Sequence, residues 1–259
     1  MADAPKVKIV TKNPDLVGEC PVWDPGQGAL LWTDNRSERI YRYVPSTGAI
    51  DTVVEGVAAY AFTLQRDGSL LLFLNATRIA VARDGVVETI VDDLPGGQDT
   101  RFNDVLVDSQ GRVIGGVLPT RGGSSGSLYS IEPGGAATKF HDGMELPNGM
   151  ALSSDERVLY VADTRARHVL AFDYGVATGA ATNARTFIDF ANDHGGPDGI
   201  TLDVEGCMWV AAPGSWAVSR YGPNGAFLQR VTLPARRPTS VGFGGDDMGT
   251  LYVTSASRQ

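Results

Sequence analysis

Short runs of β-branched and aromatic residues recur along this chain, and glycine-rich turns separate them. Glycine tolerates positive φ angles and is therefore the usual residue of tight turns, so the pattern predicts a nearly all-β protein. In one recurring phrase, a turn containing Asp or Gly leads into a short apolar strand. The phrase occurs at residues 31–33, 72–74, 113–115, 159–161, 208–210 and 251–253, with centres 41 to 49 residues apart.

A repeat of about forty residues matches the length of four short antiparallel strands with their turns. One such sheet cannot bury both of its faces unless similar sheets pack around a common axis. Six repeats therefore predict an all-β, six-bladed β-propeller that forms a single domain over residues 1–259. A β-sandwich also has short strands between turns, but it gives no reason for one phrase to recur in this way.

The last blade of this propeller is expected to be incomplete. The sixth repeat stops at residues 257–259, just after its second strand, while an unassigned strand at residues 7–10 precedes the first repeat. That N-terminal strand can supply the outermost strand of the last blade and close the ring, which removes an exposed edge. A third strand is still missing, so either the natural chain is longer or a short three-stranded blade closes the ring. We expect this blade to be weak because it leaves backbone groups unpaired.

Composition narrows the class of protein. The chain has 259 residues, 42% of them hydrophobic, and a formal charge of −8 from 22 Lys and Arg against 30 Asp and Glu. Two cysteines, Cys20 and Cys207, are too few for a disulfide framework and suit a reducing cytoplasm. The N-terminus lacks an apolar signal region and no apolar run is long enough to span a membrane, so we expect a cytoplasmic protein. An acidic balance without a basic run argues against nucleic acid as a partner.

Polar residues recur at one phase of the repeat. In four repeats an oxygen-bearing side chain stands among glycines and prolines, 11 to 13 residues before the centre of the marker phrase; the residues are Glu19, Asn103, Asn148 and Asp198. At this phase the second and sixth repeats offer weaker ligands or none. Residues at one phase of a radial repeat point to one place, so these side chains are expected to converge at the mouth of the central channel.

The converging set predicts a metal site. Two carboxylates held together repel each other unless one takes a proton or a cation lies between them. All four candidates offer oxygen, which suits a hard divalent ion, with Ca²⁺ the first choice and Zn²⁺, Mn²⁺ or Mg²⁺ as alternatives. Taken singly, Asn-Gly and Asp-Gly are ordinary turn dipeptides, so it is the shared phase that indicates a metal site.

Several longer phrases carry a resemblance over nearly the whole chain. They are Gly18-Glu19-Cys20-Pro21-Val22-Trp23, Arg101-Phe102-Asn103-Asp104, Asn148-Gly149 with residues 159–163, Pro197-Asp198-Gly199 with residues 206–211, and Pro238-Thr239-Ser240 with residues 251–254. Their order and spacing resemble the SMP-30/gluconolactonase/luciferin-regenerating-enzyme family of six-bladed propellers. The resemblance implies that Glu19, Asn148 and Asp198 bind a divalent cation, that Asn103 contributes to the metal or the substrate, and that Arg101 contacts substrate. Family members are typically lactonases, with some phosphotriesterases and regulatory calcium binders.

Three positions depart from the family pattern. Cys20 and Val105 stand where glycines are usual, and Arg121 stands where sugar-lactone hydrolases of the family can carry an acidic residue that meets substrate hydroxyls. A cation at that position favours an anionic substrate. The resemblance therefore implies the fold and the metal, but not the identity of a sugar.

The chemistry expected of this site is hydrolysis of a small lactone or ester, derived from a sugar or another organic acid. A divalent ion polarises the carbonyl and lowers the pKa of bound water. In this hypothesis Asp198 doubles as general base, while Arg101, Asn103 and Arg121 bind substrate. The alternatives are a phosphotriesterase, in which the ion polarises a P=O bond, and a non-catalytic propeller that binds calcium or a protein.

Two further motifs carry less weight. Residues 122–126 match the letters of a GxSxG nucleophile elbow, but no helical period follows Ser124, so we interpret them as a loop. His194 lies four residues before Asp198 and could act as a proton shuttle at the channel rim.

Overall fold

The computed structural model describes residues 5–11, 15–121, 125–191 and 195–257, and its regular secondary structure consists of antiparallel strands. Within those ranges no helix has the length and apolarity needed to cross a bilayer. The first sheet holds β1 (Gly18–Asp24), β2 (Ala29–Asp34), β3 (Arg39–Val44) and β4 (Ala49–Glu55), and the second holds β5 (Ala61–Leu64), β6 (Leu70–Phe73), β7 (Ile79–Arg83) and β8 (Val86–Val91). The third holds β9 (Thr100–Val107), β10 (Val113–Pro119), β11 (Gly126–Ile131) and β12 (Ala137–Met144).

The remaining sheets continue the same pattern. The fourth holds β13 (Pro147–Leu152), β14 (Val158–Asp163), β15 (His168–Gly175) and β16 (Ala180–Asp189), and the fifth holds β17 (Ile200–Leu202), β18 (Met208–Ala211), β19 (Ala217–Tyr221) and β20 (Phe227–Thr232). A last sheet holds only β21 (Pro238–Gly244) and β22 (Thr250–Ser255). In each sheet, strands adjacent in sequence pair with one another.

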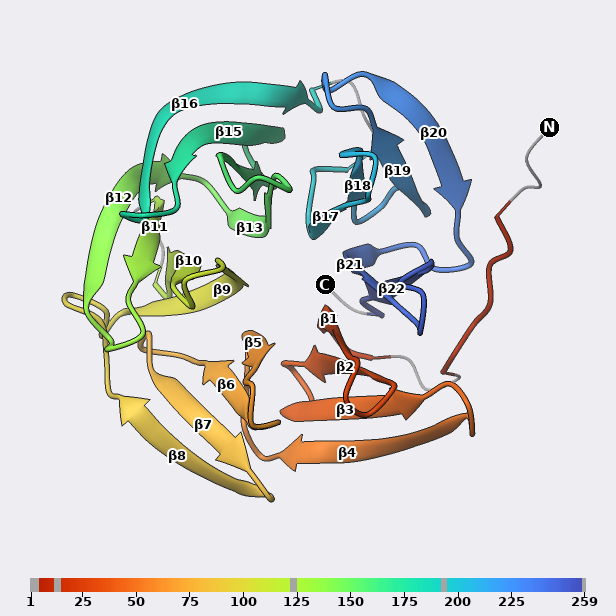
Figure 1. Cartoon of the computed structure of the whole chain (residues 1–259), viewed down its shortest axis with the longest axis horizontal. Helices are drawn as coiled ribbons and strands as arrows, with labels where there is room; N and C mark the ends of the chain where they lie inside the picture. The colour runs from red at the N-terminus through yellow and green to blue at the C-terminus, as the bar shows by residue number, and fades with distance from the viewer. Residues whose placement is uncertain (1–4, 12–14, 122–124, 192–194, 258–259) are drawn as a thin grey trace.

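The sheets surround a central axis, with the first strand of each sheet innermost (Figure 1). Each marker phrase of the sequence lies in or at the end of the second strand of its sheet, so the β-propeller prediction is confirmed. The predicted number of six blades is not reached, because the described residues form five complete blades. The two-stranded sheet β21–β22 occupies the remaining position of the ring.

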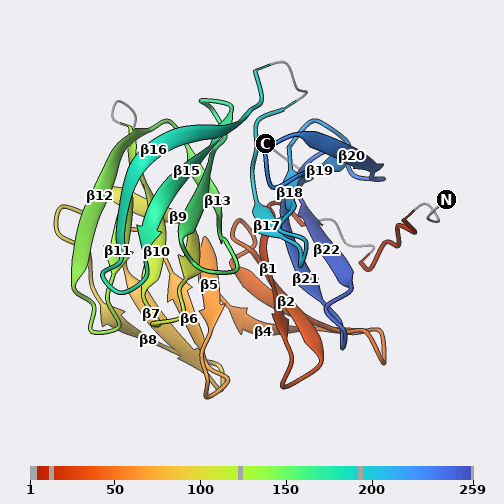
Figure 2. The same ribbon diagram turned by 45° about the horizontal axis from the view of Figure 1, so that its top comes forward.

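The prediction that residues 7–10 form the closing strand is wrong. Residues 5–11 form no strand, and Val7 and Ile9 are 47% and 64% exposed. Figures 1 and 2 show this segment running outside β22 without joining it. Hydrogen bonds hold the chain ahead of β1 to the first blade, because the amides of Leu16 and Val17 donate to the carboxylate of Asp34. The segment therefore enters along the first blade instead of extending the last one.

The ring closes through its innermost strands. The hydroxyl of Thr239 in β21 donates to the carbonyl of Gly18 in β1 at 2.5 Å. The amide of Gly199 donates to the carbonyl of Thr239 at 2.7 Å, which joins β21 to the residues before β17. A Cβ atom at Gly242 would lie 2.4 Å from the carbonyl oxygen of Pro21, so β21 and β1 pack in direct backbone contact. Closure therefore needs neither a third nor a fourth strand in the last sheet.

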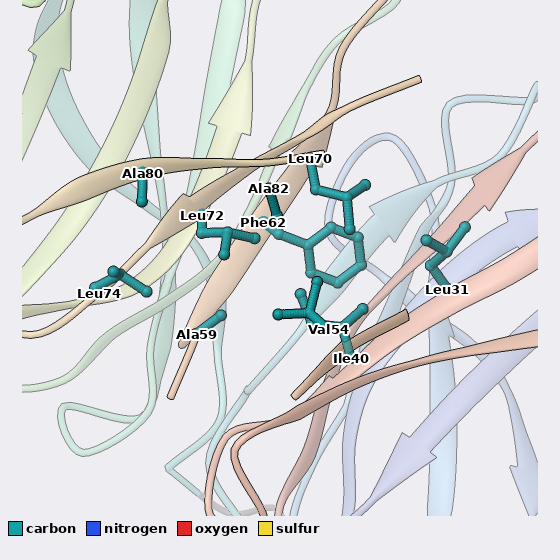
Figure 3. Packing of buried hydrophobic residues seen from close by; sticks show 10 residues of the cluster. All are labelled: Leu31, Ile40, Val54, Ala59, Phe62, Leu70, Leu72, Leu74, Ala80 and Ala82. Atoms are coloured by element: carbon teal, nitrogen blue, oxygen red, sulfur yellow. The ribbon is translucent and has the colours of Figure 1, made fainter. Parts of the chain in front are cut away.

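The hydrophobic core lies between neighbouring blades. Between the first two blades, Phe62 and Leu72 pack against Ile40 and Val54, and each of these side chains is at most 5% exposed (Figure 3). Burying one such side chain contributes about 1.5–3 kcal/mol. Similar clusters fill the spaces between the other complete blades. This packing fixes the innermost strands, whose first residues face one end of the channel.

Candidate metal and substrate site

The residues at the shared phase of the repeat lie at one end of the channel. Glu19, Asn103 and Asn148 lie near the starts of β1, β9 and β13, and Asp198 lies just before β17. In β1, β9 and β13 the register shifts at these positions, which marks a β-bulge where two residues oppose one on the neighbouring strand. Bulges bend the strand and redirect side chains, and they are frequent next to active sites. The bulges thus place the polar side chains at the channel mouth.

Three buried carboxylates influence one another electrostatically there, although their oxygens do not all lie within 4.8 Å of one another. Burial raises the pKa of Glu19 well above its usual value, and the negative charges of Asp198 and Asp104 raise it further. Burial likewise raises the pKa of Asp198, with Asp104 adding to the effect, and it raises the pKa of Asp104 to about 6. Asp198 is 5% exposed, and its Oδ1 atom has no hydrogen-bond partner among the described residues. A buried carboxylate oxygen without a partner is costly unless a proton or a cation stabilises it.

A threonine connects two members of the set. The side-chain amide of Asn148 donates from Nδ2 to the hydroxyl of Thr164 at 3.1 Å, and that hydroxyl donates to the carbonyl of Pro197 at 2.8 Å. Within the described ranges this is the only hydrogen bond of the Asn148 side chain, so its carbonyl oxygen is left to accept a ligand. The bridge holds Asn148 beside the segment that carries Asp198.

The glycines after these residues do not serve turns. Gly149 lies within β13, and neither Gly149 nor Gly199 has a positive φ angle. A Cβ atom at Gly149 would lie 2.4 Å from the amide nitrogen of Ile200, and one at Gly199 would lie 2.2 Å from the hydroxyl of Ser240. The Asn-Gly and Asp-Gly pairs therefore reflect the close approach of innermost strands around the channel, and the interpretation of these pairs as turn dipeptides does not hold.

Arg101 and Asn103 form the polar edge beside the carboxylates. Nη1 of Arg101 donates to the side-chain oxygen of Asn103 at 2.7 Å and to the carbonyl of Phe102 at 2.9 Å. The guanidinium lies 4.5 Å from the centre of the Tyr60 ring, in a cation–π contact. Nδ2 of Asn103 donates to the carbonyl of Pro147 at 2.9 Å. Asn103 therefore fixes the orientation of Arg101, whose remaining N–H groups are available to a substrate.

This donor set fits a divalent cation. It combines buried carboxylates from Glu19, Asp104 and Asp198, an oxygen of Asp198 without a partner, and the accepting oxygen of Asn148. Oxygen donors of this kind suit a hard ion such as Ca²⁺, and a bound cation would relieve the repulsion that raises the carboxylate pKa values. Glu19, Asn148 and Asp198 therefore stay the candidates to hold such an ion.

A second acidic group is already paired with an arginine. Asp203, Glu205 and Cys207 offer ligand atoms within 4.8 Å of one another. Arg220, however, pairs with Asp203 at 2.6 Å and also pairs with Glu205. Its positive charge occupies the place where a cation would act, so this group is a poorer candidate than the channel mouth.

Sequence reasoning missed three contributors. Asp104 directly follows Asn103, and consecutive strand residues normally face opposite ways, but the register shifts in β9 at this point and the charge of Asp104 acts on Glu19. Tyr60 and Thr164 act through contacts with Arg101 and Asn148, and they stand outside the shared phase. The signal that could have identified Asp104 is its charge next to a candidate ligand.

Some predicted positions lie apart from this cluster. Arg121 is exposed on the segment after β10, and the described residues give it no contact with the carboxylates. His194 and residues 122–124 lie outside the described residues. Cys20 adopts a φ angle of 53° and donates its thiol to the carbonyl of Phe62 at 3.4 Å. That left-handed conformation explains why glycine is usual in the family phrase.

Comparison with known proteins identifies the family of the chain. The family model described as "SMP-30/Gluconolactonase/LRE-like region" matches residues 17–257. The chain belongs to this family. It is 39% identical to pentonolactonase XacC of Haloferax volcanii over 93% of this chain and 81% of that protein.

Two solved structures of the family superpose closely. A luciferin-regenerating enzyme gives a TM-score of 0.89 with 29% identity, over 96% of this chain and 86% of the other. A calcium-binding regucalcin of Agrobacterium tumefaciens gives a TM-score of 0.88 with 26% identity, over 97% and 86%. The family thus includes proteins named for lactone chemistry and for calcium binding.

Proposed function

We propose that this protein is a divalent-metal-dependent lactonase that opens a small lactone of a sugar or another organic acid. The observation that carries the proposal is the buried Oδ1 atom of Asp198, which has no hydrogen-bond partner among the described residues and belongs to a carboxylate that interacts electrostatically with Glu19 and Asp104. A structural carboxylate at this depth is normally hydrogen-bonded. An unsatisfied acidic cluster at a channel mouth is typical of a site that binds and activates a ligand.

The proposed roles follow from the contacts. Glu19, Asn148 and Asp198 hold the cation, with Asn103 nearby as a further ligand or a substrate contact. When bound, a divalent cation supplies a Lewis acid that polarises a lactone carbonyl and lowers the pKa of water. Asp198 accepts the proton of the attacking water, which makes it the catalytic base.

Substrate positioning falls to the polar edge. Tyr60 and Asn103 hold Arg101 in place, and we assign its other N–H groups to orient the oxygens of a lactone. We assign Arg121 as a further substrate contact because it follows β10, whose Leu118 pairs with Arg101. No histidine or thiol is required in this scheme.

The names of the relatives support both the lactone substrate and the divalent cation of the proposal. The name pentonolactonase belongs to the relative that is 39% identical, which favours a sugar lactone as substrate. The regucalcin of Agrobacterium tumefaciens is described as calcium-binding, which favours Ca²⁺ as the ion, with Zn²⁺, Mn²⁺ and Mg²⁺ as the alternatives to be compared.

The test is a titration of released acid at constant pH. Chelated protein is supplied with a panel of aldonolactones, simple organic lactones and phosphotriesters, with and without Ca²⁺, Zn²⁺, Mn²⁺ or Mg²⁺. We expect at least one lactone to be hydrolysed only when an ion is present. Turnover of phosphotriesters alone would replace the lactonase by a phosphotriesterase. Ion binding without turnover of either class would support the non-catalytic calcium binder.

A further inference from the structure

Two exposed arginines occupy equivalent places in opposite blades. Arg36 lies two residues after Asp34, which pairs with Gly18 at the start of β1, and Arg165 lies two residues after Asp163, which pairs with Pro147 at the start of β13. In antiparallel sheets the loop after the second strand lies at the same end as the start of the first strand. Both arginines therefore stand at the end of the channel that holds Glu19 and Asn148.

The turns that carry them are built alike. The amide of Arg36 donates to the carboxylate of Asp34 at 3.2 Å, and the amide of Ala166 donates to the carboxylate of Asp163, also at 3.2 Å. Figure 1 shows the first and fourth blades, β1–β4 and β13–β16, on opposite sides of the axis. Each carboxylate anchors its turn, so the two arginines approach the mouth from opposite sides.

Their charges act on the residue between them. Burial lowers the pKa of Arg101, and the positive charges of Arg36 and Arg165 lower it further. Like charges influence one another in this way only at short range. The strand register places the loops of Arg36 and Arg165 at the end of the channel where β9 begins, near Arg101.

Ion pairing does not by itself separate the rim arginines from the others, because Arg66 on the β5–β6 turn also forms no ion pair with the described residues. Arg42 pairs with Asp51 at 2.5 Å and Arg185 pairs with Asp173 at 2.8 Å. Arg36 and Arg165 form no ion pair with any residue in the described part of the chain. Acidic residues outnumber basic ones by 30 to 22, so the lack of partners does not reflect a shortage of carboxylates. A positive rim above an acidic interior attracts an anion to its outer part.

We propose that Arg36 and Arg165 select lactones that carry a second, anionic group far from the lactone carbonyl, such as a phosphate, sulfonate or carboxylate. The inference rests on the proposed lactonase function. The carboxylates and their cation receive the carbonyl end, and the rim arginines receive the charged end. Because the cation lies inside the channel mouth and the arginines lie at its rim, binding of the anionic group also orients the substrate.

The test uses two lactones that differ only at the distal end, glucono-1,5-lactone and its 6-phosphate. We compare kcat/KM for both in wild type, Arg36→Gln, Arg165→Gln and the double variant, with Arg66→Gln as control. Arg66 is an exposed arginine on the β5–β6 turn at the opposite end of the ring. We expect kcat/KM of wild type to be higher for the 6-phosphate than for the neutral lactone. The ratio of the two kcat/KM values should fall about three- to fivefold in each rim variant and about tenfold or more in the double variant. Arg66→Gln should leave it unchanged.

A binding readout makes the inference testable without turnover. The open-chain products, gluconate and 6-phosphogluconate, are titrated into wild type and the double variant by calorimetry. We expect wild type to bind 6-phosphogluconate more tightly than gluconate, the double variant to lose this difference, and salt to weaken it. This result supports the inference even if neither lactone is hydrolysed. Equal binding of both products, or a preference that survives in the double variant, overturns it. Hydrolysis of the neutral lactone alone overturns this inference and leaves the lactonase proposal standing.

Discussion

Two buried aspartates, one at each end of the ring, show opposite ways of keeping a charge inside a protein. Asp108, between β9 and β10, is 4% exposed, and Asp198 is 5% exposed. Oδ2 of Asp108 accepts hydrogen bonds from Nη1 of Arg112 at 2.5 Å and from the hydroxyl of Tyr174 at 2.7 Å. Its Oδ1 accepts from the amide of Arg112 at 2.8 Å. Asp198 is buried to nearly the same degree, but its Oδ1 atom has no hydrogen-bond partner in the part of the chain that the structure describes.

The difference separates a structural carboxylate from a functional one. Arg112 also donates to the carbonyl of Val176 and pairs with Glu132, so the Asp108 network ties the third blade to the fourth. The hydrogen bond to Glu132 and the neighbouring acidic groups raise the pKa of Arg112. A network with every atom satisfied favours one rigid arrangement. The unsatisfied oxygen of Asp198 costs stability, which proteins commonly accept where a ligand must bind.

The largest expected effect is on catalysis. Asp198→Asn keeps the size of the side chain but removes the charge and the base, so kcat/KM for the best lactone should fall by about a thousandfold or more. The melting temperature of the metal-free protein should stay the same or rise, because a repulsive charge is gone. Asp203→Asn is the control for loss of a carboxylate elsewhere. Activity within tenfold of wild type would remove Asp198 from the mechanism.

The matching substitution at Asp108, whose two carboxylate oxygens accept hydrogen bonds, should affect stability instead of catalysis. Asp108→Asn breaks the buried pair and leaves only the more exposed Glu132 to compensate the charge of Arg112, which should cost about 3–5 kcal/mol in the free energy of unfolding. Urea titration followed by tryptophan fluorescence measures this loss. Turnover per folded molecule should be unaltered. A loss below 1 kcal/mol in the free energy of unfolding, or a selective loss of turnover, would contradict a purely structural role of Asp108.

The acidic cluster should also make the metal-free protein less stable as pH rises from 4 to 7. The pKa of Asp104 is raised to about 6, so the folded state holds a proton that the unfolded state releases at lower pH. Its contribution to stability is complete below the unfolded pKa near 3.8 and is lost as pH rises through 6. Melting temperatures from pH 4 to 7 should therefore decline less steeply in Asp104→Asn than in wild type. Parallel curves would show that Asp104 does not titrate in this range.

The smallest effect is expected at Tyr174. Tyr174→Phe removes one of the hydrogen bonds to Asp108 while the ion pair with Arg112 remains, so the loss should be about 1 kcal/mol. Urea titration of the single variants and of Tyr174→Phe combined with Asp108→Asn forms a double-mutant cycle. A coupling energy of zero would show that the hydroxyl and the carboxylate act independently.

Much of the fold could be predicted because the repeat is local. The marker phrases locate the second strands, and turn residues bound them. Closure of the ring could not be predicted, since it depends on Thr239 meeting Gly18, 221 residues away in sequence. A strand pattern at residues 7–10 has no partner in the structure, because hydrogen bonds to Asp34 fix the chain that follows it.

The site shows the same division between local and distant information. The shared phase placed Glu19 and Asp198 together, because residues at equivalent positions of a radial repeat face the same end. Asp104 escaped that reasoning, since a bulge in β9 changes the alternation of side chains and no local pattern marks it. Arg36 and Arg165 lie in loops outside the phase, and only strand register reveals that they share the mouth.

The most direct test of the central claim is a calorimetric titration of Ca²⁺, and of Mn²⁺ in parallel, into chelated wild type, Asp198→Asn and Asp203→Asn. We expect one ion per chain in wild type, the same stoichiometry and affinity in Asp203→Asn, and no measurable binding in Asp198→Asn. Binding that persists in Asp198→Asn, or that disappears in Asp203→Asn, would contradict a cation held at the channel mouth.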